Sequence, residues 1–268
     1  MLHMSVSSTQ DFLTCRRLYY YKRIKKYEKT AYNLPFIVGR VVHEGLAALL
    51  NKSKDPKTGK PNVLALMKAT FVKERLMAQK QYVLSPEQLA ELDRQEFVTR
   101  GMLLAYATKY SKMIRDIRLM GSEVEGAVQL SDDVTFVIKL DNIVKIRGKK
   151  VLHELKTTKS ITPDYVKRIQ TDLQTAAYYH FHNIIFEDEK IDEIMYDVIR
   201  KPSIKQKKKK ETLPEYMNRL AEWYKKPDDY GGVFHIERFK KPGITEDAII
   251  NTAVKVSEEM LRSKQKDD

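Results

Sequence analysis

Residues 134–156, VTFVIKLDNIVKIRGKKVLHELK, form the segment from which the rest of the chain is interpreted. In residues 134–141, the apolar side chains recur every two positions, which is the period of a strand with one buried face. Residues 147–150 are typical of a turn, in which Gly148 tolerates a positive φ. The chain then returns through a second apolar segment, 151–156. The sequence therefore predicts an antiparallel hairpin.

This hairpin brings two acids and a lysine onto one face. We assume a short loop that places Ile146 opposite Val151. Asp141 then lies opposite Lys156, and Glu154 becomes a diagonal neighbour of Asp141, roughly 7–8 Å away at the backbone. Two carboxylates at this separation can converge on one hard divalent cation, with the lysine beside it, which is typical of metal-assisted phosphodiester hydrolysis. The alternative is a solvated hairpin face that carries ordinary charges.

The composition favours a globular protein with a polyanionic partner. Of the 268 residues 42% are hydrophobic, and no apolar run approaches the ~18–20 residues of a membrane span. Lys and Arg exceed Asp and Glu by 49 − 36 = 13, which suits a partner such as DNA, although many lysine-rich proteins are simply soluble. The single cysteine, Cys15, predicts a reducing compartment. Residues 1–5 have neither a basic nor an apolar segment, so no signal peptide is expected.

A first helix is predicted to begin at residues 7–10, SSTQ, which form a capping-box pattern with Ser7 as the cap. Phe12, Cys15 and Tyr19 recur at helical spacing and are expected to face the core. Cationic side chains alternate with tyrosines around them, so that cations could pair with phosphates while rings stack on bases. These residues are Arg16, Arg17, Tyr19, Tyr20, Tyr21, Lys22, Arg23, Lys25 and Lys26. The alternative is a solvated helix with aromatic packing.

A second helix is predicted from Pro35, with His43 at the edge of its apolar stripe. A histidine in that position more often packs or caps than binds a ligand. After a polar connector at 53–61, helices are expected at 63–81 and 86–119, and together they form an insertion or lid before the sheet.

A strand predicted at 123–130 leads into the hairpin and contains Glu125, either an accessory acid or a surface residue. After the hairpin, a helix is predicted to begin at Thr162-Pro163-Asp164, in the favoured order of cap, proline and acid. Three polar side chains spaced four apart then form one stripe, which must lie beside the strand that carries the candidate acid and lysine. The stripe consists of Gln170, Gln174 and Tyr178.

The C-terminal part is predicted to contain a strand at 191–200, a helix at 213–225, a strand at 233–239 and a helix at 245–262. A basic loop separates the first two elements. Its cations could bind a polyanion, or they could simply be solvated charges. They are Lys201, Lys205 and Lys207 to Lys210.

Four motifs occur in an order that resembles the PD-(D/E)XK nuclease superfamily, most closely its RecB-like exonuclease branch. They are Ser7…Cys15-Arg16-Arg17-Leu18-Tyr19, Gly39-Arg40-Val41-Val42-His43, Asp141…Glu154-Leu155-Lys156 and Gln174-Thr175-Ala176-Ala177-Tyr178, and the resemblance covers roughly Ser5 to Lys201. It implies an α/β fold with a restriction-endonuclease-like core, a small mixed sheet flanked by helices. We expect one nuclease domain over 1–268, with a helical N-terminal insertion in 1–120, a catalytic core in 121–200, and the basic loop and C-terminal extension in 201–268.

The resemblance also implies roles for the matching residues. His43, Asp141 and Glu154 would bind metal together with the carbonyl of Leu155. An oxygen-rich site of this kind implies one or two Mg²⁺ or Mn²⁺ ions rather than zinc. Some relatives hold an iron–sulfur cluster through four cysteines, one of them at the place of Cys15, and the other three are absent from this sequence, so no such cluster is expected.

Lys156 would orient or activate the attacking water and stabilise the charge that develops on the phosphate. Gln174 would hold Lys156 or a phosphate. The residues expected to contact DNA are Arg16, Arg17, Tyr20, Tyr178, Lys201 and Lys205. One departure from the family pattern is that Lys139 and Leu140 precede Asp141, where a glycine is usual.

The implied function is a metal-dependent DNA exonuclease that acts on DNA ends in recombination, repair or phage DNA metabolism. One alternative is a structure-selective endonuclease of the same superfamily, and another is a non-catalytic DNA-binding or scaffold protein. The sequence contains no Walker A motif, so a helicase, an annealing protein or a single-strand-binding protein is an expected partner beside DNA. We expect no membrane association and a location in the cytoplasm of a bacterium or a phage-infected cell.

Overall fold

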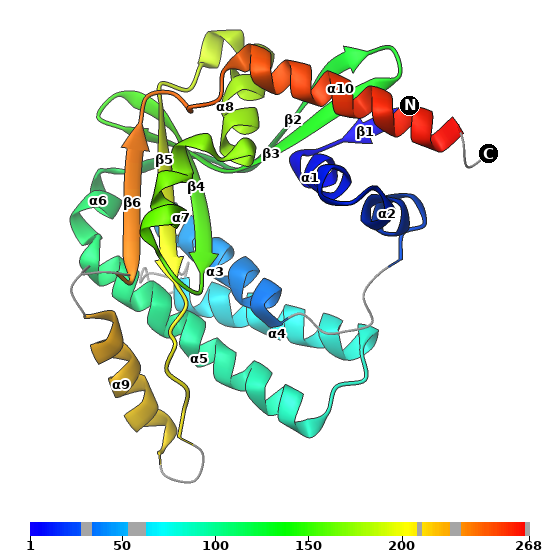
Figure 1. Ribbon diagram of the computed structural model, residues 1–268. Helices are drawn as coiled ribbons and strands as arrows, with labels where there is room; N and C mark the ends of the chain where they lie inside the picture. Colours follow the sequence, from blue (N-terminus) through cyan, green and yellow to red (C-terminus); the bar gives the residue numbers. More distant parts are fainter. Residues whose placement is uncertain (28–33, 53–62, 208–210, 226–231, 266–268) are drawn as a thin grey trace.

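The computed structural model describes residues 1–27, 34–52, 63–207, 211–225 and 232–265. A six-stranded mixed sheet with helices on both faces forms the centre of the molecule (Figure 1). The α/β class and the small mixed sheet flanked by helices are therefore confirmed. The connector predicted at 53–61 and the loop lysines Lys208 to Lys210 lie outside the described residues.

The sheet contains β1 (Leu2–Met4), β2 (Arg118–Ser131), β3 (Val134–Ile146), β4 (Lys149–Thr158), β5 (Glu193–Arg200) and β6 (Phe234–Phe239). The helices are α1 (Val6–Thr14), α2 (Arg16–Tyr19), α3 (Leu34–Leu50), α4 (Val63–Gln81), α5 (Pro86–Lys109), α6 (Ser111–Asp116), α7 (Pro163–Lys167), α8 (Leu173–Ile185), α9 (Leu213–Tyr224) and α10 (Glu246–Gln265). A π-helical turn (Tyr20–Ile24) and two 3₁₀ turns (Ile169–Thr171 and Glu187–Glu189) complete the described elements.

Strand β3 organises the sheet because one of its edges changes partner. Its first edge pairs antiparallel with β2 along nearly the whole strand. Its second edge pairs in parallel with β1 as far as Phe136, and antiparallel with β4 from Asn142 onward. Strand β5 then adds in parallel to β4, and β6 antiparallel to β5. Residues 137–141 thus lie on an edge between two partner strands, and Asp141 immediately precedes the point where β4 begins to pair.

The β3–β4 turn is tighter than the sequence analysis predicts. Arg147 (φ 50°) and Gly148 (φ 86°) both have positive φ, as in a two-residue type I′ turn. Lys149 consequently pairs with Ile146, the place that was predicted for Val151. The predicted four-residue turn was wrong because a type I′ turn reverses the chain with two residues, and the two lysines that follow join the strand. The register shifts by two, an even number, so every side chain stays on its predicted face.

One face of the sheet is covered by α3 and α5, while α4 packs against α3 and α9 packs against α5 (Figure 1). The buried side chains of this layer are continuous with those of the sheet and include Leu46, Phe71, Met102, Leu103 and Leu155. The helices predicted as an insertion or lid are therefore a packed layer of the core. Helices α1, α8 and α10 cover the other face, where Phe136, Phe181 and Met260 are buried.

The N-terminal predictions need three corrections. Residues 1–5 were assigned no element, yet Leu2 and Met4 are buried in β1, which takes up the open edge of β3. Helix α1 is capped by Ser5 in a capping box with Ser8, two residues before the predicted cap. Cys15 was expected to face the core but is exposed, because it is an extended residue (φ −164°) between α1 and α2.

Two later helices also differ from their predictions. The single helix predicted at 86–119 is divided at Tyr110 into α5 and α6, which ends at Asp116, and the residues from Arg118, including Gly121, belong to β2. The helix predicted from Thr162 is broken into α7, a 3₁₀ turn and α8, because Asp172 caps a new helix by accepting a hydrogen bond from the backbone of Thr175 (2.8 Å).

Candidate active site

The acidic residues of the hairpin lie where β3 and β4 separate. The ladder between these strands ends at the pair Asn142–His153, so Asp141 and Glu154 are the next residues on either side. Beyond this pair, a side chain takes the place of a backbone hydrogen bond between the strands. The Oδ2 of Asp141 accepts a hydrogen bond from the backbone N–H of Leu155 (3.1 Å). The two carboxylates therefore lie opposite each other rather than diagonally as the sequence analysis predicts, and the end of the ladder leaves their side chains at a strand junction.

Lys156 connects the hairpin to α8. Its Nζ donates to Glu154 Oε1 (2.5 Å) and to Gln174 Oε1 (2.8 Å). The Nε2 of Gln174 donates in turn to the hydroxyl of Tyr178, one turn further along α8 (3.0 Å). The predicted polar stripe thus contributes two of its three members to the site. Gln170, the third, instead bonds Glu237 of β6 (2.7 Å), because the helix is broken between Gln170 and Gln174.

His43 reaches the same site from α3. Its Nδ1 lies 3.4 Å from Asp141 Oδ2, and the exposed fractions of the two side chains are 28% and 16%. Burial alone lowers the pKa of His43, but the hydrogen bond to Asp141 and the charges of Asp141 and Glu154 outweigh it and raise the pKa. His43 of α3 and Asp141 of β3, which are far apart in sequence, therefore lie side by side, and their role as metal ligands stays a prediction.

Glu154 is the most unusual group of the site. Its side chain is fully buried, and its Oε2 has no hydrogen-bond partner among the described residues. Burial raises the pKa of Glu154 to about 7, against the opposing effect of Lys156, and the charge of Asp141 adds to the rise. A buried carboxylate oxygen without a donor is costly unless a cation or a proton satisfies it.

The neighbouring groups are charged near neutral pH. Burial opposes the charge of Lys156, but Glu154 and Asp141 more than compensate and raise its pKa above the ordinary value. Burial likewise acts to raise the pKa of Asp141, but His43 and Lys156 together hold it below the usual value. The site therefore combines a cationic lysine with two acids, one of which holds its proton more tightly than an exposed carboxyl does.

The donor set suits a hard divalent cation, although the side chains are not preassembled around one. In the described ranges, no three His, Cys, Asp or Glu side chains converge as a ready-made metal site. Glu154 turns one oxygen toward Lys156, and the Nδ1 of His43 faces Asp141. The unpartnered Oε2 of Glu154 and the carboxylate of Asp141 nevertheless supply oxygen ligands. The Leu155 carbonyl points to the same strand edge as its N–H, because both groups of a strand residue face one neighbour.

Comparison with known protein families identifies the superfamily of this chain. The sequence profile of the PD-(D/E)XK nuclease superfamily matches residues 3–242, which is most of the chain. The protein belongs to the PD-(D/E)XK nuclease superfamily. No curated protein matches it.

Two solved structures are similar at low identity. One is the crystal structure of SSO0001, with a TM-score of 0.33 and 14% identity, covering 86% of this chain and 88% of that chain. The other is a phage-related exonuclease from Haemophilus somnus 129PT, with a TM-score of 0.34 and 10% identity, covering 83% of this chain and 95% of that chain. Both likenesses are remote, so the superfamily assignment depends on the profile match alone.

The residues predicted to bind DNA lie outside this cluster, except Tyr178. Arg16 forms an ion pair with Glu259 of α10, and the guanidinium of Arg17 lies 5.7 Å from the ring centre of Tyr21. Tyr20 begins the π-helical turn. No described contact joins Arg16, Arg17 or Tyr20 to the hairpin acids, and their contact with DNA stays a prediction.

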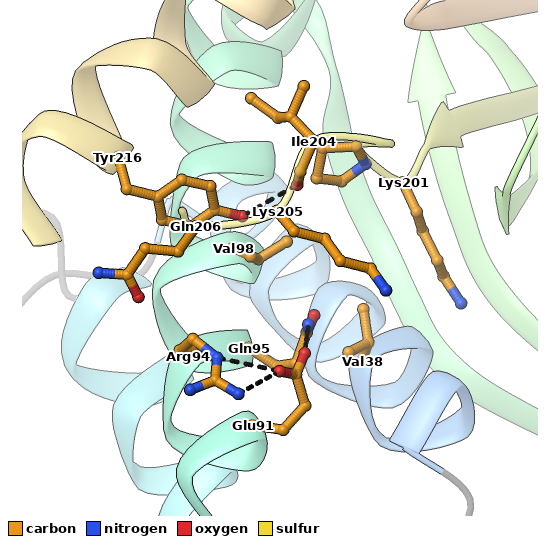
Figure 2. Close-up of a pocket in the computed structure, with 11 residues that line it drawn as sticks. Val38, Glu91, Arg94, Gln95, Val98, Lys201, Ile204, Lys205, Gln206 and Tyr216 are labelled. Atoms are coloured by element: carbon orange, nitrogen blue, oxygen red, sulfur yellow. Dashed lines mark hydrogen bonds and ion pairs between the residues drawn. The ribbon is translucent and has the colours of Figure 1, made fainter. Parts of the chain in front are cut away.

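Lys201 and Lys205 line a separate hollow of about 150 Å³ between α3, α5 and the segment after β5. Figure 2 shows both lysine side chains extending from that segment, with Glu91 and Arg94 of α5 across the hollow. The Nζ of Lys201 donates to the carbonyl of Pro35 (3.0 Å), and burial, together with Lys159, lowers its pKa. Lys201 therefore supports the start of α3, and a role of either lysine toward DNA stays a prediction.

Glu125, considered as an accessory acid, is on β2 and forms an ion pair with Lys139 (3.4 Å). Its side chain is 67% exposed, in contrast to the buried acids of the hairpin. This position fits the surface role.

A buried polar cluster lies behind the hairpin and was not predicted from the sequence. His153 and Asp197 lie on the opposite face of β4 and β5, 3.1 Å apart, and Tyr106 of α5 donates its hydroxyl to Asp197. All three side chains are inaccessible to solvent. The cluster ties the inserted α5 to the strands that carry Glu154. A histidine and an aspartate within otherwise apolar strands are the signal that could have revealed it.

The burial of Glu154 has a measurable consequence for stability. Because its folded-state pKa of about 7 exceeds the unfolded value of 4.5, the native state keeps a proton that the unfolded state releases between these values. The free energy of unfolding of the wild type should therefore fall as the pH rises through this window. The fall should exceed that of Glu154→Gln, which has no titrating carboxyl at this position, by up to about 3 kcal/mol. Urea unfolding in EDTA at about pH 5 and about pH 8 measures the difference. A gap between the two proteins that does not change with pH would contradict the buried carboxyl.

The described residues contain no helix long and apolar enough to cross a membrane.

Proposed function

We propose that this protein hydrolyses phosphodiester bonds of DNA, from DNA ends, in a reaction that depends on Mg²⁺ or Mn²⁺. The observation that carries the proposal is the buried oxygen of Glu154 beside Asp141, which has no hydrogen-bond partner within the described ranges, while Lys156 is bonded to the other oxygen. Such an arrangement destabilises the metal-free protein, as expected for groups placed for a reaction rather than for stability.

Asp141, Glu154, the carbonyl of Leu155 and His43 would hold one or two divalent ions. Oxygen ligands dominate this set, which favours Mg²⁺ or Mn²⁺. When bound, such an ion would neutralise charge on the scissile phosphate and lower the pKa of a water molecule. The pairing of His43 with Asp141 holds both side chains at the junction before any ion binds.

Lys156 supplies the positive charge that the chain itself contributes. An ammonium group has three donors, and the bonds to Glu154 and Gln174 use two of them. The third can donate to a phosphate oxygen or to the attacking water. Gln174 and Tyr178 fix the direction of the amine from α8, so the donor is positioned before substrate arrives.

DNA as the substrate is supported by the formal charge of +13 and by the superfamily. Action at ends is supported by the depth of the site. Glu154 is fully buried, and the side chains of Asp141 and Lys156 are only 16% and 27% exposed. A strand end can approach so recessed a site more easily than an uninterrupted duplex can.

Linear and covalently closed DNA should therefore differ as substrates. We expect linear single- or double-stranded DNA to be degraded in Mg²⁺ or Mn²⁺, and closed circles of the same sequence to survive. Gel analysis of both forms over time, with EDTA as the control, tests this. Rapid nicking or linearisation of the circles would favour a structure-selective endonuclease, and no cleavage of any form would favour a DNA-binding or scaffold protein.

A further inference from the structure

A second hollow lies beside the hairpin on the face that carries Glu154. Its volume is about 340 Å³, and its lining residues are Tyr165, Arg168, Ile169, Thr171, Asp172, Leu173 and Tyr196. The hollow exists because the helix after β4 is interrupted. Helix α7 ends at Lys167, a 3₁₀ turn follows, and α8 begins only at Leu173.

The 3₁₀ turn that forms one wall of the hollow is fixed by hydrogen bonds to Gly243 and to β6. The N–H of Gly243, before α10, donates to the carbonyl of Gln170 (2.6 Å), and the Nε2 of Gln170 donates to Glu237 of β6 (2.7 Å). A β-carbon at Gly243 would lie only 3.1 Å from that carbonyl, so glycine permits the approach. The hollow is thus formed before any ligand binds.

Both sides of the hollow adjoin the candidate catalytic residues. Tyr196 of β5 is the strand partner of Glu154, so the two side chains lie next to each other on one face of the sheet. Leu173 immediately precedes Gln174, which bonds Lys156. Burial raises the pKa of Tyr196, and Asp172, Tyr165 and Glu154 raise it further, which is consistent with this proximity.

The chemistry of the lining suits a nucleobase better than a bare phosphate. Two tyrosines and two aliphatic side chains provide ring-stacking and apolar surface, whereas Asp172 is occupied as the cap of α8. Arg168 is the only cation among the lining residues, and it is exposed at the rim, with its Nε bonded to the carbonyl of Asp164 (3.1 Å). A base inside a duplex is covered on both faces by its neighbours, so only an unpaired nucleotide can enter.

We propose that this hollow is a base-binding subsite, in which an unpaired nucleobase close to the scissile phosphate stacks on Tyr165 while Arg168 contacts the flanking backbone. The subsite rests on the proposed nuclease function and deepens it, because it makes an unpaired or frayed end the preferred substrate.

The test uses a set of fluorescently labelled single strands of about 12 nucleotides, each with one abasic residue at a different position. Binding to each strand is measured by fluorescence anisotropy in EDTA. An abasic residue removes the base and leaves the backbone. We expect one position, or two adjacent ones, at which its presence weakens wild-type binding by roughly tenfold. Tyr165→Ala should weaken binding of the intact strand by a similar factor. In this variant, an abasic residue at the sensitive position should weaken binding no further, because the contact between the base and Tyr165 is already absent.

Two further variants separate ring stacking from folding. Tyr165→Phe keeps the ring and should behave as the wild type, whereas Tyr165→Leu keeps apolar bulk without the ring and should resemble Tyr165→Ala. The subsite would be overturned if the losses of binding free energy from Tyr165→Ala and from the abasic residue were additive. It would also be overturned if no abasic position specifically weakened binding to the wild type. Cleavage of the intact strand in Mn²⁺ is measured in parallel. If the strand is cleaved but no abasic position specifically weakens binding, only the subsite proposal is contradicted. If an abasic position weakens binding in a way that depends on Tyr165 but the strand is not cleaved, only the proposed nuclease function is contradicted.

Discussion

Replacing Glu154 by glutamine is expected to lower DNA cleavage by roughly two to three orders of magnitude or more. The substitution keeps the shape of the side chain but removes the negative charge of the buried oxygen, which has no hydrogen-bond partner in the part of the chain that the structure describes. Asp141→Asn should act similarly, because it removes the second carboxylate of the junction. DNA affinity in EDTA should change little, since general attraction to the backbone comes from cations elsewhere on the chain. Turnover in Mg²⁺ or Mn²⁺ and anisotropy in EDTA measure the two effects separately.

Glu125→Gln is the matched control for this experiment. Glu125 is also a glutamate on the sheet, but it is exposed and ion-paired with Lys139. Its substitution should leave turnover near the wild-type value. Cleavage that persists undiminished in Glu154→Gln and Asp141→Asn would show that the reaction occurs elsewhere.

Lys156→Ala is expected to reduce turnover at saturating DNA by roughly 10²–10³-fold, the usual effect of removing one positioned electrostatic donor. The reason is that Lys156 is fixed between Glu154 and Gln174, at 2.5 and 2.8 Å, so its charge is already in place for the phosphate. Initial rates across a DNA concentration series separate turnover from apparent affinity.

Lys205→Ala serves as the comparison, because Lys205 lines the separate hollow shown in Figure 2. If it contacts DNA, its loss should weaken binding and reduce the salt dependence while saturated turnover stays close to normal. The opposite pattern, in which Lys205→Ala loses turnover and Lys156→Ala loses only affinity, would mean that the active site has been placed wrongly.

The fold and the main site residues could be predicted because their signals are local or periodic. The alternation in β3 and the apolar stripe of α3 indicate which side chains are buried. The faces of Asp141, Glu154 and Lys156 follow from a period of two, so an error of two residues in the register left them correct. The roles of His43 and Gln174, in contrast, came only from the family resemblance, although the polar stripe had already indicated that Gln174 lies beside the hairpin.

The missed features depend on tertiary contacts that leave little mark on the sequence. A strand of three residues, β1, is stable only because β3 has an open edge for it. The break before α8 depends on an aspartate cap and on the contact between Gly243 and Gln170, 73 residues apart in sequence, and the hollow beside Tyr196 exists only because of this break. The bond between His153 and Asp197 likewise joins two strands, and each residue alone is simply a polar interruption of an apolar run.

We propose that Asp141 and Glu154 bind a divalent ion at the junction of β3 and β4. Anomalous diffraction at the manganese edge, from crystals soaked in Mn²⁺, locates the ion directly. We expect a peak about 2 Å from a carboxylate oxygen of Asp141 and from Oε2 of Glu154, and no such peak in Glu154→Gln. Full Mn²⁺ occupancy elsewhere with none at this junction, or an undiminished peak at the junction in Glu154→Gln, would contradict this proposal.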